Sequence, residues 1–168
     1  MRSIKSFITL SLLIAGLSLS VSAQSSLVSL GGGRVDLASQ KGKIVILAIG
    51  ATWLPLSMKQ AEYTNVLARR YSGKNVAVYF VTTDSSLAKS KNYASDDDIR
   101  KFVGASKLTT SILRDSDGAF TLKKYHIDQL PSFIILDKAG NQAGDAIGGI
   151  DPKFDITVPI SKTVDSLL

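Results

Sequence analysis

A nearly continuous apolar run over residues 43–49 constrains the fold of this chain more than any other feature of the sequence. Because its apolar residues do not alternate with polar ones, the run is typical of a strand covered on both faces. Apolar residues then recur at helical spacing over 58–71, and residues 75–83 predict a second strand rich in Val and aromatic side chains. The helix is expected to turn its polar residues outward, at Lys59, Glu62, Asn65 and Arg69. Strand, helix and strand in this order predict a right-handed parallel crossover and hence an α/β fold.

The remaining elements are predicted from turn residues and short strand-forming runs. In chain order they are a β-hairpin of 27–30 and 34–37 around three glycines, a helix from 99 to 105, a strand at 111–114, a short helical segment at 120–125, a hairpin of 132–136 and 142–147, and a helix over 152–168. Ser95 is expected to cap the second helix, where the carboxylates of Asp96 to Asp98 oppose the helix dipole. Pro159 is expected to kink or delay the last helix, because proline has no backbone N–H to donate.

The first 23 residues have the pattern of a secretory signal peptide. A basic start precedes an apolar run from Phe7 to Leu19, and Val21-Ser22-Ala23 offers a cleavage site after Ala23. The run is shorter than the roughly 20 apolar residues that a membrane-spanning helix needs. We therefore expect a signal peptide over 1–23 and one domain over 24–168. The mature protein is expected to be exported, to a periplasmic or extracellular space, without a stable membrane anchor.

Composition excludes several classes of site. The chain has no cysteine, so it offers no disulfide, no thiolate nucleophile and no thiol for lipid attachment. With His126 as its single histidine it lacks the donors of a zinc or copper site, and Asp115-x-Asp117-Gly118 lacks the remaining ligands of a calcium loop. No metal and no cofactor are therefore expected. The formal charge of +6, which becomes +4 when Arg2 and Lys5 leave with the signal peptide, is scattered, so no nucleic-acid partner is expected.

Several short motifs occur in a characteristic order along the chain. They are Gly42-Lys43 before the first core strand, Ala51-Thr52-Trp53 after it, Thr83-Asp84, Asp115-Ser116-Asp117-Gly118, Leu130-Pro131-Ser132-Phe133 and Leu136-Asp137-Lys138-Ala139-Gly140. With these motifs the chain resembles the exported thioredoxin-like thiol-disulfide reductases of cytochrome maturation, the TlpA/ResA-like or redoxin proteins. The resemblance covers nearly all of the mature chain. It implies a thioredoxin-like α/β fold, with a central mixed sheet flanked by helices and an N-terminal β-hairpin.

The chain departs from this family at the active site. The family motif is Trp-Cys-x-x-Cys, and its two sulfurs fall on Leu54 and Ser57. A leucine cannot act as the nucleophile, and a serine hydroxyl forms no stable counterpart of a disulfide, so thiol-disulfide exchange is excluded and no catalytic residue is assigned. Ala48 takes the place of the buried carboxylate of thioredoxin. The resemblance implies that Pro131 is a cis-proline facing the tryptophan-bearing turn.

An exposed apolar patch is expected around the degenerate active-site positions. The resemblance places six residues there: Trp53, Leu54, Pro55, Leu56, Leu130 and Pro131. Such patches commonly mark interaction surfaces, and in relatives the backbone beside the proline pairs with an extended substrate peptide. We therefore expect non-covalent binding of an extended peptide or an exported protein.

Four alternatives to this binding role remain open. The first alternative is that the degenerate site has decayed and has no present role. The second is that the chain is a structural subunit of an envelope complex. A third alternative is an enzyme of the superfamily that uses an external thiol, such as glutathione, for thiol-disulfide or peroxide chemistry. The fourth is a hydrolase in which Ser57 is the nucleophile and His126 the base, although such a pair also needs an oxyanion site and an orienting acid.

Overall fold

The computed structural model describes residues 26–168, so the signal peptide predicted over 1–23 lies outside the described residues. In chain order its elements are β1 (Ser26–Ser29), β2 (Arg34–Asp36), the 3-10 helix η1 (Leu37–Gln40), β3 (Ile44–Gly50), α1 (Ser57–Arg70), β4 (Val76–Thr82), α2 (Asp96–Ser106), β5 (Ser111–Arg114), the 3-10 helix η2 (Ser116–Gly118), α3 (Thr121–Lys124), β6 (Ser132–Leu136), β7 (Ile147–Gly148) and α4 (Thr157–Leu167). This order agrees with the sequence prediction.

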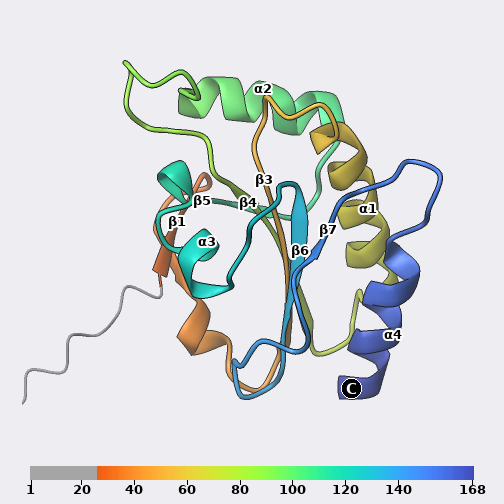
Figure 1. The fold of residues 1–168 in the computed structure, drawn as a ribbon. Coiled ribbons are helices and arrows are strands. Elements are labelled where there is room, and N and C mark those ends of the chain that lie inside the picture. Colours follow the sequence, from red (N-terminus) through yellow and green to blue (C-terminus); the bar gives the residue numbers. More distant parts are fainter. Residues whose placement is uncertain (1–25) are drawn as a thin grey trace, which may run out of the picture.

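The strands form one mixed sheet of seven, in the order β2-β1-β5-β4-β3-β6-β7 (Figure 1). β3, β4 and β5 run parallel, whereas β6 pairs antiparallel with β3 and β1 pairs antiparallel with β5. The β1-β2 hairpin and the β6-β7 pair close the two sides of the sheet. The predicted crossover from β3 through α1 to β4, the mixed sheet and the N-terminal hairpin are therefore confirmed.

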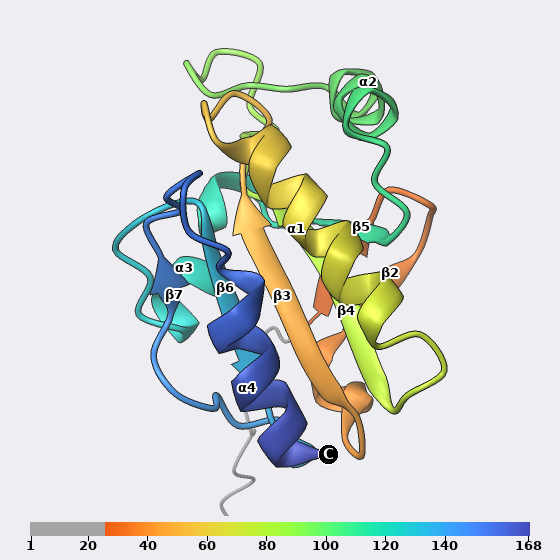
Figure 2. The same ribbon diagram turned by 90° about the vertical axis from the view of Figure 1, so that its right-hand side faces the viewer.

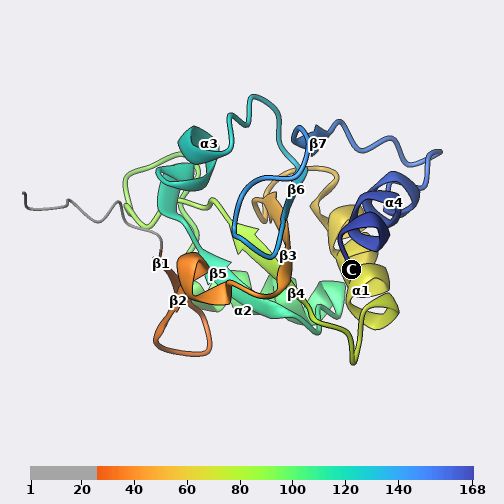
Figure 3. The ribbon, with the colours of Figure 1, turned by 90° about the horizontal axis from the view of Figure 1, so that it is seen from below.

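β3 is buried along its whole length because apolar clusters cover both faces of the sheet. Its residues alternate between a cluster shared with α1, α2 and α4, reached by Ile44, Ile46 and Ala48, and a cluster shared with η1 and α3, reached by Val45, Leu47 and Ile49. Figures 2 and 3 show α1 and α4 together on one face of the sheet and α3 on the other. Burial on both sides explains why the run 43–49 shows no polar alternation.

α4 begins at Thr157, five residues later than the sequence pattern predicted. The carboxylate of Asp155 accepts the backbone N–H of Thr157 at 2.9 Å and its hydroxyl at 2.7 Å, and these bonds hold the first residue of the helix. Pro159 lies in the first turn, where the backbone N–H groups have no intrahelical acceptor, so its missing donor leaves no helical hydrogen bond unmade.

The second strand of the last hairpin is shorter than predicted. β7 contains only Ile147–Gly148, and the predicted strand over 142–147 is otherwise reduced to one bridge between Gln142 and Leu136. A Cβ at Gly148 would lie 2.8 Å from the Oγ of Ser132 on β6, so a larger residue here would displace that hydroxyl. The antiparallel pairing of the hairpin is confirmed.

The acidic triplet at the start of α2 forms a helix cap, as predicted. The Ser95 hydroxyl accepts the backbone N–H of Asp98 at 3.1 Å, and the Asp98 carboxylate accepts the backbone N–H of Ser95 at 3.2 Å. The hydroxyl of Ser95 also donates to this carboxylate, and together with Lys101 it lowers the pKa of Asp98.

The topology brings several loops to one edge of the sheet. β3, β4 and β5 all end at this edge, and β6 begins there because it runs the opposite way. The segments 51–56, 83–95 and 115–120 therefore lie along the same edge as Pro131. The carboxyl edge of a parallel sheet is where α/β proteins commonly bind their ligands.

Candidate functional site

The segment of residues 51–57, here called the Trp53 turn, links the end of β3 to the start of α1. The carbonyl oxygen of Ala51 accepts the backbone N–H of Leu54 at 3.2 Å and also accepts the hydroxyl of Ser57. Ser57 is fully buried, and its own N–H donates to the Leu54 carbonyl at 3.1 Å. The hydroxyl at the second sulfur position is thus used to close the turn.

The end of β4 holds the base of the Trp53 turn. The N–H and hydroxyl of Thr83 both donate to the carbonyl of Gly50, at 2.7 Å and 3.0 Å. Asp84, which is fully buried, accepts the N–H of Thr52 at 2.9 Å and its hydroxyl at 2.7 Å. The hydroxyl of Thr82 donates to the same carboxylate. Neighbouring residues of one loop therefore fasten the chain immediately before Trp53.

Gln60 ties α1 to the strands beside Pro131. Its Nε2 donates to the carbonyls of Ile49 and Ser132, each at 3.0 Å, and these two residues form the last pair between β3 and β6. Gln60 is fully buried, and its Oε1 has no hydrogen-bond partner among the described residues. A Cβ at Gly50 would overlap Oε1 and would lie 3.6 Å from the Cβ of Pro131, so glycine makes room for the amide. The Leu130-Pro131 bond is cis, as the resemblance implied.

The six residues of the predicted patch differ in exposure. Trp53 is 54% exposed and Pro55 is also exposed, whereas Leu54, Leu56 and Leu130 are half-buried and Pro131 is buried. Leu56 packs against the cluster on the α1 face of the sheet, and Leu130 packs against the cluster on the α3 face. The part of the patch that meets solvent is therefore centred on Trp53 and Pro55. The convergence of all six residues on one surface stays a prediction.

The Ser57 and His126 side chains do not form the pair that a hydrolase needs. The Ser57 hydroxyl donates to Ala51, not to a base. His126 is exposed and lines a surface hollow of about 560 Å³ together with Tyr125, Asp128 and Asp145. Within residues 26–168, no group of three or more histidine, aspartate or glutamate side chains is placed to hold a metal ion.

Sequence reasoning missed Gln60 and the role of Asp84. Thr83-Asp84 stands among the family-like motifs, but its support of the Trp53 turn was not predicted. A carboxylate directly after a strand with buried residues is the signal that could have found Asp84. Gln60 offers no comparable signal, because one polar residue in a helix is ordinarily read as solvent-exposed.

Residues 20–141 match the model of the AhpC/TSA family. The chain belongs to the AhpC/TSA family. This AhpC/TSA member is similar to the thiol-disulfide oxidoreductase ResA of Bacillus cereus, with 26% identity over 117 residues, 70% of this chain and 62% of the relative. It is also similar to ResA of Bacillus thuringiensis subsp. konkukian, with 28% identity over 109 residues, 65% of this chain and 57% of the relative. The match thus spans about three fifths of the length of these relatives.

Solved structures agree with the fold of this AhpC/TSA member. A secreted disulfide oxidoreductase of Mycobacterium tuberculosis homologous to E. coli DsbE aligns with a TM-score of 0.66 and 21% identity, over 86% of this chain and 97% of that protein. A putative thiol:disulfide interchange protein DsbE of Chlorobium tepidum aligns with a TM-score of 0.67 and 20% identity, over 83% and 92%. These similarities confirm the thioredoxin-like fold. Among residues 26–168 no helix is long and apolar enough to cross a membrane.

Proposed function

We propose that this protein is an exported, thioredoxin-fold binding module that recognises an extended peptide or an exported protein without covalent chemistry. The observation that carries the proposal is a solvent-exposed tryptophan on a hydrogen-bonded turn, at the place where its oxidoreductase relatives act, in a chain without sulfur nucleophiles. Tryptophan is one of the residues enriched among side chains that dominate binding energy.

The chemistry of the turn supports recognition rather than reaction. The two positions that would carry cysteines hold an apolar side chain, Leu54, and a buried hydroxyl, Ser57, whose proton is already donated to a carbonyl. Neither group can attack a disulfide. An indole ring, by contrast, offers a large apolar face and one N–H donor, which suits contact with an extended peptide.

Binding is tested with reduced, carboxymethylated ribonuclease A, an unfolded and thiol-blocked chain that contains no tryptophan. Because Trp53 is the only tryptophan of the protein, its emission reports occupancy during a titration. Leu54→Asp is expected to weaken binding at least about tenfold, since a charge beside Trp53 opposes apolar docking. Val158→Asp makes a similar change at an exposed apolar residue of α4 and is expected to bind as the wild type does.

Equal affinities for the two aspartate variants would contradict docking at the Trp53 turn. Absence of any response from the wild type would count against recognition of unfolded chains. Co-purification with one fixed envelope protein would then favour a structural subunit.

Membership of the AhpC/TSA family favours one second candidate, an enzyme that borrows an external thiol. Insulin reduction by the mature protein with dithiothreitol is expected to proceed at the uncatalysed rate. A panel of thiol, peroxide and ester substrates, including glutathione, extends the test to related reactions. Turnover above background that disappears in Ser57→Ala would overturn the non-catalytic proposal.

A further inference from the structure

Asp84 is a buried carboxylate whose described partners are all neutral. Both of its oxygens accept hydrogen bonds, from the N–H and hydroxyl of Thr52 and from the hydroxyl of Thr82. No ion pair within residues 26–168 involves Asp84. Removing a carboxylate from water is costly unless hydrogen bonds replace its hydration, and here three donors do so.

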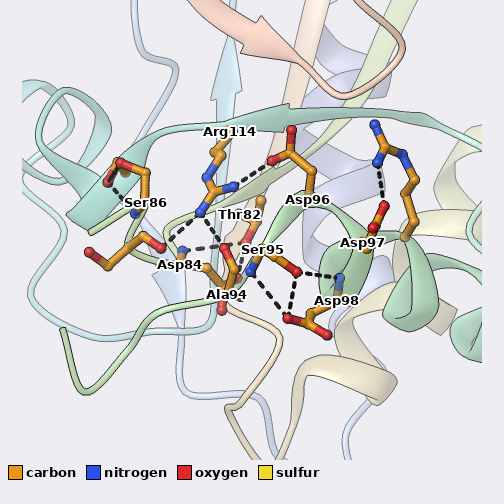
Figure 4. Close-up of polar contacts among 12 residues, drawn as sticks. Thr82, Asp84, Ser86, Ala94, Ser95, Asp96, Asp97, Asp98 and Arg114 are labelled. Carbon is orange, nitrogen blue, oxygen red and sulfur yellow. Dashed lines mark hydrogen bonds and ion pairs between the residues drawn. The ribbon is translucent and has the colours of Figure 1, made fainter. Parts of the chain in front are cut away.

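Arg114, the cation beside this site, pairs with other groups than Asp84. Figure 4 shows the guanidinium of Arg114 paired with Asp96 and donating to the backbone carbonyl of Ala94. The guanidinium also donates to the backbone carbonyl of Ser85 at 2.8 Å. These contacts hold the two ends of the 85–94 loop to the end of β5. Asp84 accepts hydrogen bonds from Thr82, at the end of β4, and from Thr52 in the Trp53 turn. Its carboxylate therefore joins the turn to the end of this strand.

Asp84 fixes the residue that immediately precedes an exposed aromatic anchor. Thr52 is held through both its backbone and its side chain, while Ser57 closes the far end of the turn on Ala51. Trp53 lies between these two fastenings with 54% of its surface exposed. Fixing a segment before the partner arrives lowers the entropy lost on binding. The local hydrogen bonds thus hold the chain on both sides of a side chain that is not part of the buried apolar clusters.

We propose that Asp84, acting through Thr52, is a positioning residue that fixes Trp53 for partner binding, an inference that rests on the proposed function of the Trp53 turn. Thr52→Val removes the hydroxyl donor and keeps the shape of the side chain. Thr52→Ser retains the donor and serves as the conservative rescue. Asp84→Asn replaces one acceptor oxygen by an amide donor that opposes the donors of Thr52.

A matched control is available at the start of α3. Asp115, also buried, accepts the N–H and the hydroxyl of Thr121, each at 2.7 Å. Thr121→Val therefore removes the same kind of hydrogen bond at a threonine that does not adjoin Trp53. Any general loss of stability appears in both valine variants, whereas an effect on Trp53 is confined to position 52.

Two readouts separate this inference from the proposed function. In the free protein, the fluorescence anisotropy of Trp53 is expected to fall in Thr52→Val and Asp84→Asn, and to stay at the wild-type value in Thr52→Ser and Thr121→Val. In titrations with reduced, carboxymethylated ribonuclease A, Thr52→Val and Asp84→Asn are expected to bind about threefold to tenfold more weakly. Thr52→Ser is expected to restore the wild-type affinity.

The outcomes decide each claim. Unchanged anisotropy in folded Thr52→Val would overturn the positioning role, whatever the titration shows. Lower anisotropy with unchanged affinity would overturn the contribution to binding. If the wild type does not bind the unfolded chain, the anisotropy series still decides whether Asp84 positions Trp53. If Asp84→Asn fails to fold, the valine and serine variants of Thr52 decide it.

Discussion

The Trp53 turn and the start of α3 lie at the same edge of the sheet and use the same chemical device. In each, a buried aspartate accepts the backbone N–H and the hydroxyl of one threonine. Asp115 reaches Thr121, which is 6 residues further along the chain, whereas Asp84 reaches back 32 residues to Thr52. The Asp115–Thr121 pair, here called the α3 clamp, lies at the start of a short helix. The Asp84–Thr52 pair, here called the Trp53 clamp, joins two loops that are distant in the sequence.

The two clamps differ most in the aromatic residue that follows. Tyr125, at the end of α3, is 3% exposed and packs into the apolar cluster, whereas Trp53 is 54% exposed. The α3 clamp completes a core. The Trp53 clamp orders an aromatic side chain that remains in water, where exposure gains nothing from the hydrophobic effect. This difference supports a binding role for the Trp53 turn and a folding role for the start of α3.

The largest expected effect is the loss of stability when Asp115, the aspartate at the start of α3, is removed. Asp115→Ala leaves two backbone N–H groups and one hydroxyl without their acceptor, at Phe120 and Thr121. We expect the free energy of unfolding in guanidinium chloride to fall by about 3 kcal/mol. The control, Asp128→Ala, removes an exposed carboxylate and is expected to change it by less than about 0.5 kcal/mol. Equal losses in the two variants would contradict a folding role for Asp115.

A smaller effect is expected from a charge change beside the Trp53 turn. In Gln60→Glu, a carboxylate would face the carbonyl oxygens of Ile49 and Ser132, so burial and repulsion raise its pKa. A raised pKa stabilises the fold below the ordinary pKa of glutamate, about 4.3, and this contribution is lost as pH rises. We expect the variant to lose about 2 kcal/mol of unfolding free energy between pH 5 and pH 8, relative to the wild type.

The exposed Gln129 provides the matched control for Gln60. Gln129→Glu introduces the same charge where water solvates it, and its stability is expected to follow the wild type over the same pH range. A Gln60→Glu variant with no extra dependence on pH would show that the amide is not held between the two carbonyls.

The smallest effect is expected from removing the hydroxyl of Tyr125, the buried aromatic residue that is compared with the exposed Trp53. The Tyr125 hydroxyl has no partner among the described residues, and burial raises the pKa of Tyr125 to about 12. Tyr125→Phe is therefore expected to change the unfolding free energy at neutral pH by no more than about 1 kcal/mol. A raised pKa favours the fold below the ordinary value, about 10, and this contribution is lost as pH rises towards about 12. The variant is expected to lack that part of the alkaline decline.

Tyr63→Phe is the comparison for Tyr125→Phe. The Tyr63 hydroxyl donates to the carbonyl of Phe154 at 3.1 Å, so its removal is expected to cost about 1 kcal/mol. A larger loss from Tyr125→Phe than from Tyr63→Phe would show that the Tyr125 hydroxyl has a partner.

Patterns that depend on neighbouring residues were predictable from the sequence. The apolar run became β3, the three glycines became the turn of the N-terminal hairpin, and Ser95 with Asp98 formed the predicted cap. In each case the determining residues lie within a few positions of one another. The bounds of α4 and β7 were less predictable. α4 begins only after the contact between Asp155 and Thr157, and β7 is limited to the two residues that pair with β6.

The polar residues that organise the candidate site were not predictable in this way. Asn65 was expected on the outer face of α1, but it is buried and binds Lys107 and Thr109, more than 40 residues away. Gln60 contacts Ser132 across 72 residues. A helical pattern indicates which side faces inward, but it does not indicate which polar side chain finds a partner there. Such contacts depend on the assembled sheet.

The Trp53 turn is closed by a hydrogen bond from the Ser57 hydroxyl to the Ala51 carbonyl, where the related reductases have a cysteine. A cysteine pair in this position switches between a dithiol and a disulfide as the surroundings become more reducing or oxidising. A serine and a backbone carbonyl have no such alternative. Thiol-alkylating agents and changes in the ambient redox potential therefore find no thiol in the Trp53 turn, so the shape of the turn does not depend on thiol oxidation.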